Sequence, residues 1–270
     1  MVEKFLNNRF FILYLIPFFI GCLTILSFEP FNLTLVNLFL FPLIFYLLVF
    51  INKKSKGVYR KKPYKKNFFI FGLTFGFGFY ISGISWITNS LTFDENFKIL
   101  IPFALILIPL FLSLFFALTT LFVGPHLKFD FPSLLIFSAA LSLSDYVRGK
   151  ILTGFPWNLW AYSTSWMNEI LQIVNSIGFY SYNLLVINFF VLPAIIFFKI
   201  SIPKKIFSLA LTFIIILSLY IFGNYEINKN NQFLNAINKK VYVKIVSPSF
   251  DLEYGLNQQE IKSRLMRLIK

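Results

Sequence analysis

The residues best suited to chemistry lie in one stretch, from Asp145 to Ser163, which reads DYVRGKILTGFPWNLWAYS. It combines the guanidinium group of Arg148 with the indole rings of Trp157 and Trp160. The planar fork of a guanidinium group fits a phosphate, and indole rings settle where hydrocarbon meets water. The stretch therefore indicates either a lipid-binding site or an ordinary aromatic belt with an arginine that extends to the membrane surface.

Other reactive side chains are few. Cys22 and His126 are the single cysteine and the single histidine of the chain, so the sequence predicts no internal disulfide, no metal site and no cofactor. Cys22 lies in an apolar run with no base beside it, so we expect an inert thiol. Glu29, in the segment SFEPF, is either a functional acid or, as we expect, a solvated acid of a loop.

The composition identifies the medium in which these residues must be positioned. Hydrophobic residues make up 57% of the 270 residues, charged residues 13%, and the mean hydropathy is +0.73. A single soluble core of this size cannot bury that much apolar surface, so the excess must face lipid. The net charge of +14 does not indicate a nucleic-acid partner, because its densest block lies in the short loop 52–67 between apolar runs.

Seven apolar runs have roughly the ~20 residues that a helix needs to cross a bilayer. We expect spanning helices at 10–28, 33–51, 68–88, 99–123, 131–147, 170–198 and 206–222. Pro193 should kink or end the sixth of them. The fold class is thus an all-α polytopic membrane protein, with a transmembrane helical domain over 1–222.

The third run holds a cluster of glycines followed by an indole. Gly72, Gly76, Gly78 and Gly83 precede Trp86. Small residues about four apart let two helices approach closely, so we interpret the cluster as a packing surface.

Loop charges predict the orientation. Basic residues gather before the first run and in the loops 52–67, 124–130 and 199–205, which all fall on one side if the spans alternate. The N-terminus should therefore be cytoplasmic and residues 223–270 on the outer side. Phe19 to Cys22 resembles a lipoprotein signal, but the apolar run continues past Cys22, so we expect an uncleaved first span.

The C-terminal residues have a different character. Apolar and more polar residues alternate, as in a strand, at Val241, Val243 and Ile245 with Tyr242 and Lys244 between them. Asn257 followed by Glu260 is typical of a helix start. One strand and one helix cannot bury a core. We therefore expect a linker at 223–240 and the incomplete start of an α/β domain at 241–270.

Three segments, in this order, resemble apolipoprotein N-acyltransferases, a family of bacterial inner-membrane enzymes. They are SFEPF (27–31), GFGFYISGISWI (76–87) and RGKILTGFPWNLWAYS (148–163). The piece VKIVSPSFDLEYG (243–255) is similar to the first strand and next loop of the nitrilase-like domain of that family. The resemblance covers nearly the whole chain but only the N-terminal half of the family.

The resemblance implies a reaction that completes lipoprotein maturation. A phospholipid acyl chain passes to a catalytic cysteine and then to the N-terminal diacylglyceryl-cysteine of an apolipoprotein, with a glutamate as base and a lysine at the oxyanion. In the family these three residues come later than residue 270, so we expect the chain to be inactive alone or to need a separate catalytic chain. The tryptophan that follows the family's first strand is not evident, since Tyr254 or Leu256 lies near that place.

By the same resemblance, six residues are candidates for contact with the phospholipid donor or the apolipoprotein acceptor. They are Arg148, Phe155, Pro156, Trp157, Trp160 and Trp86. The alternative is a non-catalytic lipid-binding or assembly module in the membrane. A transporter fits less well, because ionisable residues are nearly absent from the expected spans.

Overall fold

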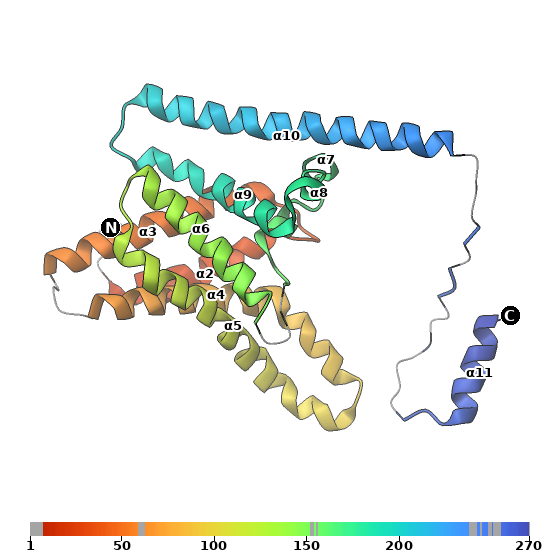
Figure 1. The fold of residues 1–270 in the computed structure, drawn as a ribbon. Helices are drawn as coiled ribbons and strands as arrows, with labels where there is room; N and C mark the ends of the chain where they lie inside the picture. Colours follow the sequence, from red (N-terminus) through yellow and green to blue (C-terminus); the bar gives the residue numbers. More distant parts are fainter. Residues whose placement is uncertain are drawn as a thin grey trace.

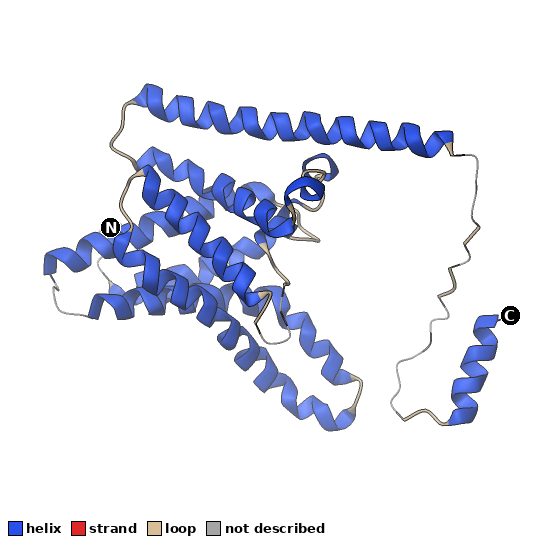
Figure 2. Ribbon diagram, viewed as in Figure 1, coloured by secondary structure: helices blue, strands red, loops and turns tan. Residues whose placement is uncertain are grey.

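The computed structural model describes residues 8–58, 63–151, 154, 156–237, 242–243, 245–247, 250 and 255–269. In these parts of the chain the regular structure is helical throughout, with no strand (Figure 2). The expected all-α membrane fold is thus confirmed in its class.

Five helical segments are long and apolar enough to cross a membrane. They are Thr34–Lys54, Lys65–Thr92, Glu95–His126, Phe179–Phe197 and Ile202–Ala236. Their main helices are α3 (Asn37–Val58), α4 (Pro63–Ile84), α5 (Ile101–Val123), α9 (Phe179–Val191) and α10 (Ile202–Ala236). Two further expected spans fall outside these five. They are the shorter apolar helix Phe11–Ser27, which includes α2 (Ile16–Thr24), and α6 (Phe131–Arg148), so the count of seven is not confirmed.

The sixth expected span, 170–198, is not one helix. It consists of the short helices α7 (Asn168–Leu171) and α8 (Val174–Ile177), then α9 and a 3₁₀ helix, Leu192–Phe197. The break before α9 falls at Gly178, whose φ of 78° suits glycine. Pro193 lies in the first turn of the 3₁₀ helix, which confirms that the α-helix ends there.

Helix α10 extends to Ala236, well beyond the expected end at 222. Residues 223–236 are polar but include no proline, so the helix continues into the segment expected as a linker. Figure 1 shows α10 lying along one side of the bundle, with its C-terminal part reaching past the other helices.

Glycines set the spacing at the centre of the bundle, where α4 packs between α2 and α5. A Cβ atom added to Gly78 would lie 2.2 Å from the carbonyl oxygen of Phe18, and one added to Gly21 would lie 2.2 Å from that of Phe75. Gly72 and Gly76 also lie in close contact with α5, where a Cβ atom on either would clash. The glycine cluster of the third expected span is therefore a helix-packing surface, as the sequence predicts.

The basic segments share one end of the bundle. Arg9 donates a hydrogen bond to Asn67 at 2.6 Å, the Nζ atom of Lys53 lies 4.2 Å from the centre of the Phe129 ring, and Lys205 donates to the carbonyl oxygen of Ile196 at 2.8 Å. The loop after α6 and helices α7 and α8 lie at the opposite end (Figure 1). The helices thus alternate in direction as the loop charges require.

The C-terminal helix α11 (Gln258–Ile269) begins where the sequence predicts a helix start. Asn257 and Glu260 cap it reciprocally, because each side chain accepts a hydrogen bond from the backbone N–H of the other, at 2.8 and 3.0 Å. The described residues of 241–247 form no strand, and 241 and 244 lie outside the described residues. The β–α start of a further domain is thus not confirmed. Helix α11 stands apart from the bundle (Figure 1).

The contact between α2 and α4 makes a first prediction. Changing Gly78 to Ala should lower the free energy of unfolding by about 1–3 kcal/mol, because the new methyl group forces two packed backbones apart. Thermal unfolding in detergent measures the loss. Ser82→Ala, on the exposed side of the same helix, is the control and should change stability by less than about 0.5 kcal/mol. Equal stability of the two variants would contradict the packing role.

Candidate functional site

The three segments that carry the family resemblance meet at one end of the bundle. The rings of Phe28 and Trp160 lie 6.0 Å apart, and the rings of Trp86 and Trp157 lie 4.9 Å apart. A Cβ atom added to Gly83 would lie 2.2 Å from the side-chain amide of Asn158. The loop that follows α6 therefore packs directly onto the ends of α2 and α4.

Trp160 lies at the centre of this contact. Its side chain has 0% exposure, stacks on Phe79 at 4.7 Å and meets the edge of Phe41 at 4.7 Å. Such aromatic pairs add about 0.5–1.5 kcal/mol each beyond the area that they bury. The structure thus places Trp160 in the packed core of this contact, and its contact with lipid or substrate stays a prediction.

Arg148 is also buried, with 2% exposure. Its Nη1 atom donates a hydrogen bond to the carbonyl oxygen of Trp157 at 2.7 Å, and its Nη2 atom donates to Oδ1 of Asp145 at 3.0 Å. The guanidinium carbon lies 5.6 Å from the centre of the Tyr80 ring. The guanidinium group therefore ties α6 to the turn at Trp157. The contact of Arg148 with a lipid phosphate, one of the two readings of the sequence, stays a prediction.

The carboxylate of Asp145 extends this network to α9. Its Oδ2 atom accepts a hydrogen bond from Asn183 at 2.9 Å, and the side-chain oxygen of Asn183 accepts one from the backbone N–H of Ala161 at 2.9 Å. The spacing of Asp145 and Arg148 places them on one face of α6. Together the three side chains hold the turn at both ends, at Trp157 and at Ala161. Sequence reasoning missed Asn183, although a polar amide inside an apolar run was a signal for it.

The turn carries an exposed pair of indoles. Trp86, in the 3₁₀ helix Ser85–Thr92 that follows α4, stacks on Trp157 with the ring planes at 28°, and the two residues keep 53% and 42% exposure. Trp86 also donates from Nε1 to the carbonyl oxygen of Gly83 at 3.2 Å. Pro156 is exposed beside this pair, and Phe155 lies outside the described residues. This exposed pair is the part of the site that an approaching molecule can reach.

The far end of the loop is held by the segment that follows α2. Thr34 donates a hydrogen bond to the carbonyl oxygen of Ser163 at 2.5 Å and accepts one from the indole N–H of Trp166 at 2.9 Å. Ser165 donates to the carboxylate of Glu29 at 3.4 Å, and Glu29 is exposed, as expected for a solvated loop acid. Hydrogen bonds thus hold the loop along its whole described length.

Within the described residues no three His, Cys, Asp or Glu side chains come together as a metal site would require. Cys22 is half-buried, and its thiol donates to the carbonyl oxygen of Gly78 at 3.4 Å. It lies in the helix contact between α2 and α4, apart from the indole pair.

Comparison with known proteins agrees with this arrangement. The family profile described as "Apolipoprotein N-acyltransferase N-terminal domain" matches residues 20–192, which include all three converging segments. The chain belongs to this family. It is 35% identical to an apolipoprotein N-acyltransferase of Rhodopseudomonas palustris over 179 residues, which are 65% of this chain and 32% of that protein.

A second relative matches over a longer stretch. The apolipoprotein N-acyltransferase of Rickettsia typhi is 28% identical over 253 residues, which are 93% of this chain and 47% of that protein. The chain therefore spans about a third to a half of the length of these relatives. Membership in this family and the five apolar helices fit a membrane protein.

The buried network makes a second prediction. Arg148→Met should lower the free energy of unfolding by about 3–5 kcal/mol, because it leaves the Asp145 carboxylate charged and buried without its cation. Replacing both partners, Asp145→Leu with Arg148→Met, should cost much less than the sum of the single changes. Thermal unfolding of the four proteins gives the coupling energy.

Lys150→Met is the matched control for these variants, since Lys150 is an exposed cation two residues further along. It should leave stability within about 0.5 kcal/mol of the parent. Additive single changes would show that the ion pair does not hold the loop.

Proposed function

We propose that the chain forms the membrane part of an apolipoprotein N-acyltransferase, which moves a phospholipid acyl chain to the N-terminal diacylglyceryl-cysteine of an apolipoprotein. The observation that carries the proposal is the exposed Trp86–Trp157 pair, held by the buried Arg148–Asp145–Asn183 network. A rigid aromatic surface at the end of a membrane bundle suits a lipid that must present its ester at the bilayer surface.

In this proposal the six candidate residues divide into two groups. Trp86, Trp157 and Pro156 are exposed and contact the lipid donor or the lipid-modified acceptor. Arg148 and Trp160 are buried and act through the loop that they position. Indole rings suit the contact because one face packs on hydrocarbon while the ring nitrogen hydrogen-bonds to a polar group.

The proposed location is the bacterial inner membrane, with the N-terminus and the basic end of the bundle in the cytoplasm. The cation-rich end fits the cytoplasmic side, where positive loops are retained. The indole pair and the C-terminal part of α10 then lie on the periplasmic side.

The acyl-transfer chemistry requires a nucleophile, a base and an oxyanion donor. We assign none of these to residues 1–270, and we propose that a nitrilase-like catalytic domain or a separate catalytic chain supplies them. Relatives two to three times as long as the matched segment support this division.

A chimera tests the proposal. Residues 1–237 replace the matching part of the Rickettsia typhi relative, and transfer of a labelled acyl chain to a diacylglyceryl-cysteine peptide is measured in phospholipid vesicles. The chimera should transfer acyl chains, whereas residues 1–270 alone should not. Trp86→Ala or Trp157→Ala should raise the KM for phospholipid about 2- to 12-fold, the equivalent of one lost aromatic contact.

Phe122→Ala is the control for the indole variants. Phe122 is an exposed aromatic residue near the C-terminal end of α5, which is the end of the bundle opposite to the indole pair. It should leave KM unchanged. A chimera that melts like its parent but transfers nothing would favour the alternative, a non-catalytic lipid-binding or assembly module.

Cysteine labelling tests the orientation. In a Cys22→Ala background, Lys54→Cys and Asn228→Cys place single thiols at exposed positions toward opposite ends of the bundle. A membrane-impermeant maleimide should label Asn228→Cys in intact spheroplasts and Lys54→Cys only after the membrane is opened. The reverse pattern would contradict the proposed orientation.

A further inference from the structure

Helix α10 touches the rest of the bundle along a narrow line. Thr212, Ile216 and Leu219 are half-buried on its inward face, and Gly223 is its one buried residue. A Cβ atom added to Gly223 would lie 1.7 Å from the carbonyl oxygen of Glu169, so the backbones of α10 and α7 are in direct contact there. Next to this contact, Ile216 and Leu219 of α10 are separated from α9 by a space.

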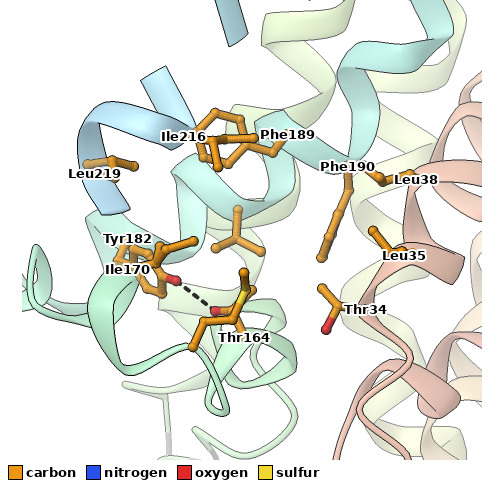
Figure 3. Close-up of a pocket in the computed structure, with 12 residues that line it drawn as sticks. Thr34, Leu35, Leu38, Thr164, Ile170, Tyr182, Phe189, Phe190, Ile216 and Leu219 are labelled. Carbon is orange, nitrogen blue, oxygen red and sulfur yellow. Dashed lines mark hydrogen bonds between the residues drawn. The ribbon is translucent and has the colours of Figure 1, made fainter. Parts of the chain in front are cut away.

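The space between them is a cavity of about 190 Å³. Phe190 of α9 lies on one side, Ile216 and Leu219 of α10 lie on the other, and Leu35 lies at the end nearest α3 (Figure 3). Val186 of α9 also lines the cavity. These five residues are all apolar, so the walls contact a guest through carbon atoms.

The hydroxyl groups at the rim are already engaged within the protein. Thr164 and Tyr182 share a hydrogen bond of 2.7 Å (Figure 3), and Thr34 is bonded to Ser163 and Trp166. A cavity of this kind does not hold water well, because a bound water needs two to four polar partners. An apolar cavity of ~150 Å³ remains dry and accepts a hydrocarbon the size of benzene, so this one has room for a segment of an alkyl chain.

We propose that this cavity binds one acyl chain of a bilayer phospholipid. Two of its walls are helices long and apolar enough to cross a membrane, so the cavity faces the hydrocarbon layer, where phospholipid acyl chains are the surrounding medium. Moving a chain out of the bilayer gains little hydrophobic free energy. An unfilled cavity, however, forfeits the dispersion contacts of its lining, and an inserted chain restores them.

This inference does not depend on acyl transfer. The cavity is lined by neither Trp86 nor Trp157, and the chain is bound without being cleaved. The cavity and the indole pair are connected through the loop, because Thr164 lies at the cavity rim and Trp157 at the other end of the same segment.

The experiment uses the whole chain in vesicles of phosphatidylethanolamine that carries a diazirine in the middle of one acyl chain. After illumination, the labelled residues are mapped by peptide mass spectrometry. Val186 and Phe190 are at most 4% exposed, so lipid that only surrounds the protein cannot reach them. We expect label on both residues, in addition to label on exposed positions of α10 such as Phe213.

Two neighbouring substitutions separate the cavity from the lipid-facing surface. Ile216→Trp fills the cavity and should lower labelling of Val186 at least about fivefold, because adding atoms to a filled site is strongly opposed. Ile215→Trp places the same ring on the exposed side of α10 and should leave that labelling unchanged. Leu219→Phe, a smaller addition at the same wall, should give an intermediate loss.

Label confined to exposed residues of the unsubstituted protein would overturn the proposal, whether the cavity is empty or holds a protein segment. An unchanged label on Val186 in an Ile216→Trp protein with the parent melting temperature would also overturn it. So would label from a photoreactive free fatty acid but none from the phospholipid.

Discussion

The candidate site depends on one buried ion pair, between Arg148 and Asp145. Removing two charges from water is costly, and a pair is tolerated inside a protein only when hydrogen bonds satisfy the remaining polar atoms. Here Asn183 bonds the second carboxylate oxygen and a backbone carbonyl receives the guanidinium group. These bonds fix the loop to α6 and α9. The loop in turn positions the exposed indole ring of Trp157, on which Trp86 stacks.

Aromatic packing also holds the loop in place. Trp160 lies between the two points at which the network holds the loop, and its ring fills a hole formed by Phe79 and Phe41. The hydrogen bonds hold the turn at Trp157 and Ala161, and ring packing holds Trp160 against the helices beneath it. This division explains why three segments that are distant in sequence form one surface: each contributes a ring or a glycine to the same contact.

The sequence predicted those features that depend on residues close together in the chain. The apolar runs predicted helices, the glycine spacing predicted close helix contacts, and Asn257 with Glu260 predicted the cap of α11. The partner of Asp145 on α9 was missed, because Asn183 lies 38 residues further along the chain and the bond exists only in the folded bundle. The sequence left a lipid phosphate as one possible partner of Arg148, and in the structure the carboxylate of Asp145 accepts one of its hydrogen bonds. The extra length of α10 was missed because hydropathy marks where a membrane ends, not where a helix ends.

That extra length has a mechanical consequence. Helix α10 has 35 residues and, at ~1.5 Å per residue, is about 52 Å long. The hydrocarbon layer is only ~30 Å thick, so roughly 20 Å of helix projects into the aqueous phase. A flexible segment would let its far end sweep a wide volume, whereas a projecting rod keeps Ala236 at a set height above the lipid headgroups. Ala236 is thereby restricted to a shallow layer of solution, and it samples that layer only by tilting of the helix.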